Sequence, residues 1–207
     1  MLGVNASEFM ELSKSMLAKV NVDPEKIEKD GAEAHLENLD GVVVPGGFGD
    51  RGTQGKIMAA QYAREHKVPY LGICLGLQIA VIDFARDVLG KAGANSTEFD
   101  EATPHPAVIF MPEGSRTHMG GTMRLGSRQT NLQTKDCDAF RLYGGDMEIH
   151  ERHRHRYEVN PEMIGELEAA GMRFVGKDTE GERMEIIELT GHPYFFATQR
   201  RRKKRLQ

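Results

Sequence analysis

The chain has 207 residues, which is enough for one domain with a sizeable core. With 39% hydrophobic and 28% charged residues it has the composition of a globular protein, and no apolar run approaches the ~20 residues that span a bilayer. The formal net charge is -4 although residues 200–205 are all Lys or Arg, so the rest of the chain is acidic and offers no broad basic surface for nucleic acid.

The first predicted elements are helices. Residues 6–20 place apolar side chains at helical spacing. Asp23-Pro24-Glu25 is typical of a helix start, because Asp is a capping residue and Pro fits the first helical position. The charged segment 26–39 is expected to form a surface helix and a loop.

The next segment predicts alternating strands and helices. Residues 41–45 and 68–73 are short apolar runs, typical of strands buried on both faces. Each run is followed by an apolar helical pattern, over 53–66 and 77–88 respectively. This alternation is typical of a parallel sheet whose strands are joined by crossover helices.

After residue 100 the predicted elements are shorter. A helix is predicted over 160–171, closed by glycine. The candidate strands are 107–111, 141–143, 157–159, 173–175 and 184–189. We therefore predict a single α/β domain over 1–207, with a mostly parallel, doubly wound, flavodoxin-like sheet. Such a sheet normally opens with a central strand, and nothing before residue 40 has that pattern, so the first strand is expected to be missing or incomplete.

The strongest chemical signal is Gly72-Ile73-Cys74-Leu75-Gly76, a G-x-C-x-G between an apolar strand and an apolar helix. Small residues two before and two after the cysteine permit a sharp turn that presents the thiol at a helix N-terminus, where its pKa falls. The alternative is a buried cysteine between packing glycines. Because the N-terminus shows no export signal, we expect a cytoplasmic protein in which Cys74 and Cys137 remain thiols.

Two further segments carry candidate chemistry. Gly46-Gly47-Phe48-Gly49 follows the preceding strand and offers backbone N–H groups for an oxyanion hole, with a phosphate cradle or a plain turn as alternatives. Residues 150–158 alternate His and Arg, which is typical of a solvated charged face and also suits capture of a substrate carboxylate by arginine. Because the interleaved arginines would repel a cation, the sequence predicts no metal site.

Five segments, in this order, resemble the glutaminase domain of CTP synthases, a branch of the class I glutamine amidotransferases. The resemblance covers about residues 40–199, and residues 200–207 form a basic tail that does not match. The segments are Val44–Gly49, Gly72–Gln78, Asn95–Phe99, Gly120–Gly126 and Glu151–Asn160.

The resemblance implies an enzyme in which Cys74 attacks the side-chain amide of glutamine. Gly47 matches the oxyanion-hole glycine, Glu98 the acid that receives the substrate amino group, and Arg156 the arginine near its carboxylate. Arg51 and Gly52 match the loop associated with activation by GTP. The strip that contacts glutamine is matched by Leu75, Gly76, Leu77 and Gln78.

The resemblance also implies partners. Ammonia would pass to a synthetase domain that is absent from this sequence and that converts UTP to CTP with ATP and magnesium, a ligase reaction of pyrimidine nucleotide biosynthesis. That domain would carry the homo-oligomer contacts. No cofactor is expected in the glutaminase domain itself, and neither a membrane nor nucleic acid is expected as a partner.

The chain departs from the family after Gln199. Class I amidotransferases place a Gln-Phe-His-Pro-Glu segment there, whose His activates the cysteine and whose Glu orients the His. Here Arg201 stands at the His position and Lys203 at the Glu position. We expect a fragment with impaired turnover. The alternative is an inactive pseudoenzyme that binds glutamine or a partner and uses its basic tail for nuclear localisation or nucleic acid.

Overall fold

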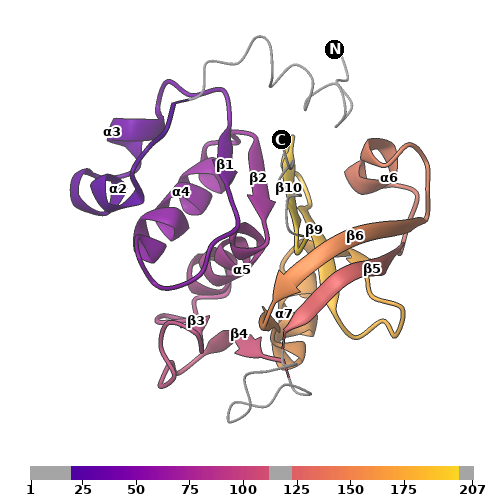
Figure 1. Cartoon of the computed structure of the whole chain (residues 1–207). Helices are drawn as coiled ribbons and strands as arrows, with labels where there is room; N and C mark the ends of the chain where they lie inside the picture. The colour runs from indigo at the N-terminus through magenta and orange to yellow at the C-terminus, as the bar shows by residue number, and fades with distance from the viewer. Residues whose placement is uncertain (1–19, 112–122, 201–207) are drawn as a thin grey trace, which may run out of the picture.

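The computed structural model describes residues 20–111 and 123–200, and these form an α/β fold around a curled seven-stranded sheet (Figure 1). A second sheet consists of β3 (Asn95–Ser96), β4 (Pro106–Phe110) and β7 (Tyr157–Val159). In spatial order, the larger sheet contains β1 (Val42–Val44), β2 (Tyr70–Ile73), β10 (Phe195–Thr198), β9 (Met184–Leu189), β8 (Met172–Lys177), β5 (Arg124–Leu132) and β6 (Glu148–His155).

Helices cover the sheet and join its strands. Two of them, α4 (Thr53–Glu65) and α5 (Leu75–Asp87), lie side by side against β1 and β2 (Figure 1). α5 is buried from Leu75 to Ala85, because its side chains are apolar nearly all round. The others are α2 (Pro24–Asp30), α3 (Glu33–Leu36), α6 (Asp138–Leu142), the 3-10 turn η1 (Pro161–Met163) and α7 (Ile164–Ala169).

The α/β class and the early strand–helix alternation are confirmed, but the pairing is more mixed than a mostly parallel sheet. Within the described residues, parallel pairing in the large sheet is confined to β1–β2 and β2–β10. The strands β9, β8, β5 and β6 continue it in antiparallel pairs. In the described part of the chain only β1 and β2 are followed by long crossover helices, which parallel neighbours require.

The strand predicted at 141–143 is wrong, because this segment closes α6. The start of this helix is held by one distant partner and by its own N-cap residue, Cys137: Ala139 N donates to Glu188 Oε1 at 2.8 Å. Phe140 N donates to Cys137 Sγ at 3.3 Å. The helix predicted at 6–20 lies outside the described residues except at its last position. Between residue 20 and β1 the chain forms α2 and α3, so β1 is the edge strand of the described sheet.

Within 20–111 and 123–200, no helix has the length and apolar character needed to cross a membrane.

Candidate active site around Cys74

The predicted sharp turn is present, and Cys74 lies at its apex. The residue connects β2 to α5 with φ 55 and ψ -102, and Lys67 is the only other non-glycine residue with positive φ in the described part of the chain. The Cys74 N–H donates to the Thr198 carbonyl of β10 at 2.7 Å. Backbone strain of this kind persists only where surrounding contacts hold it, and it concentrates at functional sites. The geometry favours a nucleophile over a cysteine that merely packs.

Both glycines of the G-x-C-x-G segment are required sterically. A Cβ on Gly72 would lie 2.7 Å from the Gly76 carbonyl oxygen and 2.7 Å from Ala197 Cβ. A Cβ on Gly76 would lie 2.2 Å from the carbonyl oxygen of Val44. The first turn of α5 therefore packs directly on the β1 and β2 backbones, which fixes the position of the thiol.

The loop after β1 lies against the nucleophile, as expected for two neighbouring parallel strands. A Cβ on Gly46 would be 3.3 Å from Cys74 Cβ, and one on Gly47 would be 3.2 Å from Leu75 Cδ2. The glycine pair thus brings backbone close to the thiol and the start of α5. This placement favours the oxyanion-hole interpretation over a plain turn.

A small pocket opens beside the thiol and brings together five of the eight residues predicted for the glutamine site. Its lining contains Gly47, Phe48, Cys74, Gln78, Glu98, His155, Arg156 and Tyr157. Leu75, Gly76 and Leu77 are buried in α5 and do not line it. Gln78 is held in place because its Nε2 donates to the Tyr157 carbonyl at 3.0 Å.

The pocket carries one acidic and one basic group from different segments. Burial raises the pKa of the Glu98 carboxyl, while the backbone N–H of Gly49, 3.5 Å from Glu98 Oε1, and the charge of Arg156 oppose that rise. The Arg156 Nε atom is buried and has no hydrogen-bond partner among the described residues. An acid and a guanidinium with an unsatisfied Nε match the ammonium and carboxylate of an amino acid.

The residues associated with GTP lie apart from this pocket lining. Arg51 Nε is 2.9 Å from Glu25 Oε1 of α2. Gly52 caps α4 with φ 63, and a Cβ there would lie 2.5 Å from Pro24 Cγ. Both residues thus fasten α2 to the start of α4. Their predicted role in binding GTP stays a prediction.

Sequence reasoning did not single out Gln199 and His155 as site residues. Gln199 Nε2 donates to Cys74 Sγ at 3.8 Å, and the Gln199 side chain is buried at the end of β10. His155 lines the pocket from β6. The period-2 alternation of His with Arg over 150–156 was the available signal, since it is typical of a strand with one buried face.

His155 is not placed to act as a base for Cys74. One of its ring nitrogens, Nδ1, is 3.1 Å from the Tyr157 carbonyl, and the other, Nε2, is 3.2 Å from Nδ1 of His153. Burial lowers the pKa of His155 to about 3 and that of His153 to about 4. Both imidazoles are therefore neutral and weakly basic near pH 7.

The end of β10 is braced by Glu151. Thr198 Oγ1 donates to Glu151 Oε2 at 3.0 Å, and Arg200 Nε lies 3.2 Å from Glu151 Oε1. Because Thr198 also accepts the Cys74 N–H, this contact links β6, β10 and the nucleophile. The predicted departures at Arg201 and Lys203, and the rest of the basic tail after Arg200, lie outside the described residues.

Comparison with known proteins supports the same assignment. The family model for glutamine amidotransferase class-I matches residues 5–199. Over 192 residues the chain is 53% identical to CTP synthase 1-A of Xenopus laevis, covering 93% of this chain and 32% of that protein. It is 50% identical over 192 residues to CTP synthase 1 of Homo sapiens, with the same coverage. The chain thus spans about a third of the length of these curated relatives.

A solved structure shares the fold closely. The Trypanosoma brucei CTPS glutaminase domain with bound acivicin superposes with a TM-score of 0.85 at 35% sequence identity. The superposition covers 94% of this chain and 76% of that one. A glutamine amidotransferase from Thermotoga maritima, at 15% identity and a TM-score of 0.58, shares the fold.

Proposed function

Because the chain belongs to the class-I glutamine amidotransferase family, and within it to the glutaminase domains of CTP synthases, we propose that the Cys74 pocket binds glutamine and reacts with its side-chain amide. The observation that carries the proposal is the strained cysteine at a helix N-terminus, facing a pocket that contains Glu98 and Arg156. Glu98 receives the substrate ammonium and Arg156 its carboxylate, which directs the carboxamide toward Cys74.

The chemistry follows from nucleophilic catalysis. The Cys74 thiolate attacks the carboxamide carbon, and the C–N bond breaks as ammonia leaves with an added proton. Water then attacks the thioester carbon and releases glutamate and the thiol. The backbone around Gly47 and Leu75 supports the negative charge that develops on the carbonyl oxygen in both steps.

We also propose an activity for the full-length protein. Ammonia passes to a synthetase domain that aminates UTP to CTP with ATP and magnesium, GTP activates the glutaminase step, and the assembly is an oligomer in the cytoplasm. The similarity to full-length CTP synthases supports this role. It favours the glutaminase over a separate nucleic-acid-binding module built on residues 200–207.

We further propose that this chain hydrolyses glutamine slowly. The leaving ammonia must gain a proton and the hydrolytic water must lose one, and general acid–base help of this kind contributes ~10²–10⁴-fold. Arg201 occupies the position of the family's histidine and stays protonated, so it cannot accept a proton. Neither Gln199 nor the weakly basic His155 replaces it.

A glutamine-shaped thiol electrophile tests the binding half of the proposal; acivicin, bound in the Trypanosoma brucei domain, is a suitable first choice. We expect peptide mass spectrometry to find the adduct on Cys74, and glutamine to slow labelling while glutamate release stays low. The Cys74→Ala variant is the control and must lose the adduct. Labelling at Cys137 instead, or no protection by glutamine, would refute the site.

A further inference from the structure

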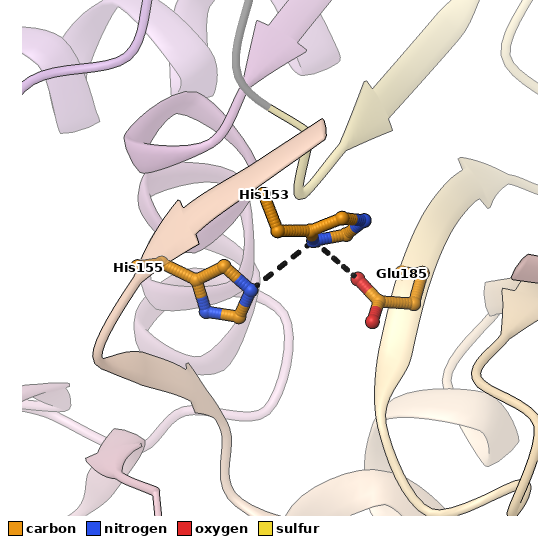
Figure 2. Close-up of side chains that lie close together, drawn as sticks. All are labelled: His153, His155 and Glu185. Carbon is orange, nitrogen blue, oxygen red and sulfur yellow. Dashed lines mark hydrogen bonds and ion pairs between the residues drawn. The ribbon is translucent and has the colours of Figure 1, made fainter. Parts of the chain in front are cut away.

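Three buried side chains outside the proposed reaction converge on one point. His153 and His155 extend from β6 and face Glu185 of β9 (Figure 2). His153 Nδ1 is 3.2 Å from His155 Nε2 and 3.5 Å from Glu185 Oε2. One ligand atom from each residue lies within 4.8 Å of the other two. β6 and β9 are not neighbours in the sheet, so its curl brings these residues together.

The arginines that alternate with these histidines do not face the cluster. Along β6 the burial pattern alternates, so His153 and His155 point inward while Arg152 and Arg154 are exposed on the other face. The sequence predicted no metal site because the interleaved arginines would repel a cation. Since Arg152 and Arg154 lie on the opposite face of β6, this repulsion does not apply directly at His153 and His155.

The charges that face the cluster are of both signs. Arg124 Nη2 is 3.1 Å from Glu185 Oε1. Arg183 pairs with Asp178 at 2.8 Å and with Glu158 at 3.0 Å. The carboxylates of Glu158, Asp178 and Glu185 thus pair with the guanidinium groups of Arg124 and Arg183, while the charge of Arg128 also acts on His153.

The spacing of the candidate ligand atoms fits a small metal ion. Tetrahedral zinc, with metal–nitrogen bonds of about 2.0–2.1 Å, separates its ligand atoms by about 3.3–3.4 Å. The two pairs that contain His153 Nδ1 are 3.2 and 3.5 Å apart, on either side of that value, and the third pair lies within 4.8 Å. Two histidines at positions i and i+2 of one strand necessarily point to the same side.

The surroundings orient these side chains as metal ligands are usually oriented. His155 Nδ1 donates to the Tyr157 carbonyl at 3.1 Å, which leaves the lone pair on Nε2 directed at the cluster. The Arg124 guanidinium holds Glu185 Oε1 and leaves Oε2 toward His153. Contacts of this kind to a ligand's other atom fix its tautomer and direction.

The cluster also has unsatisfied polar atoms. Glu185 Oε2 and His153 Nε2 are buried and have no hydrogen-bond partner in 20–111 and 123–200. The side chains of His153 and Glu185 are only 1% and 2% exposed. A buried carboxylate oxygen without a partner is unfavourable by a few kcal/mol (about 1–3), so a bound cation would remove that penalty.

We propose that His153 Nδ1, His155 Nε2 and a Glu185 carboxylate oxygen bind one divalent cation of the zinc type, which prefers imidazole and carboxylate ligands in this number. The ion fastens β6 to β9. Because His155 also lines the Cys74 pocket and Arg156 follows it, the ion fixes the wall of that pocket that meets the substrate carboxylate.

Cobalt(II), a spectroscopic substitute for zinc, tests the proposal in protein that is made without a histidine tag and stripped with a chelator. We expect saturable binding of a single equivalent with ligand-field bands, displaced by zinc. His153→Gln and Glu185→Gln should weaken it at least ~100-fold, since even outer contacts of a metal site are worth ~10–100-fold. His150→Gln, on the exposed face of β6, is the matched control and should bind normally. The Cys74→Ala variant should also bind cobalt normally.

Absence of saturable cobalt binding in the unmodified protein would overturn the proposal, as would equal binding by His153→Gln and His150→Gln. If the ligand variants do not fold, nitrogen NMR of the unmodified protein with labelled histidines decides the matter. Zinc must then shift two of the eight histidines, one at Nδ1 and one at Nε2. Any other pair, or a shift of none, would refute the site.

Discussion

Replacing Gly76 with alanine tests whether the turn at Cys74 depends on direct contact between α5 and β1. The new Cβ would lie 2.2 Å from the Val44 carbonyl oxygen and 3.1 Å from its carbonyl carbon. Both are backbone atoms of a strand paired with β2, so they cannot move aside as a flexible side chain would. Overpacking in a well-packed core is unfavourable by ~1–3 kcal/mol or more.

Alanine also has a helix propensity better than that of glycine by at most ~1 kcal/mol, which offsets part of this effect. We expect Gly76→Ala to lower the free energy of unfolding by ~2 kcal/mol. With a urea m-value of ~2 kcal/mol/M, the midpoint falls by ~1 M at unchanged m. Labelling of Cys74 should slow as well, because the shifted helix start moves the thiol.

Gly165→Ala is the matched control, since Gly165 lies in α7 and a Cβ there meets nothing within 4 Å. It should stabilise the protein by ~0.5–1 kcal/mol through helix propensity alone. The steric argument is refuted if the free energy of unfolding of Gly76→Ala differs from that of the unmodified protein by less than ~0.5 kcal/mol. It fails equally if both alanine variants lose the same stability.

Three further predictions concern the substrate. Arg156→Ala should abolish the protection of Cys74 by glutamine, whereas Arg152→Ala, at an exposed position of β6, should keep it. Loss of protection in both variants would show a general effect of charge. Burial raises the pKa of Glu98, so protection should weaken as the pH falls through that raised pKa and protonation removes the ammonium partner, and the Glu98→Gln variant should lose this dependence. The combined change Arg200→Phe, Arg201→His, Arg202→Pro and Lys203→Glu should raise glutamate release ~10²–10⁴-fold in a steady-state assay, and no gain would mean that the missing base is not what limits turnover.

The nucleophile was predictable because its determinants are local. An apolar strand, two glycines around a cysteine and an apolar helix lie within residues 68–88, and each has a recognisable pattern. The structure adds the reason for the glycines, which is close contact with Val44 and Ala197. The order of β1, α4, β2 and α5 follows from the same local patterns and from the preference of parallel strands for helical crossovers.

The strands β5 and β6 were not predicted because few of their buried positions are apolar. The inward positions of β6 are Ile149, Glu151, His153 and His155, so three of the four are polar residues. Glu151 is tolerated inside because it has a partner on another strand, Thr198 of β10. Such pairing is visible only once the sheet has curled.

The position of Arg156 in the pocket depends on where β6 ends. If the alternation of β6 continued one residue further, Arg156 would point outward with Arg152 and Arg154. Instead β6 ends at His155, and Tyr157 begins β7 in the other sheet, paired with β4. The Arg156 carbonyl accepts the Met111 N–H at 2.9 Å, which fixes the backbone at the change of sheet. The guanidinium thus reaches the Cys74 pocket because the chain leaves one sheet for the other at this residue, and hydrophobic periodicity contains no signal for that change.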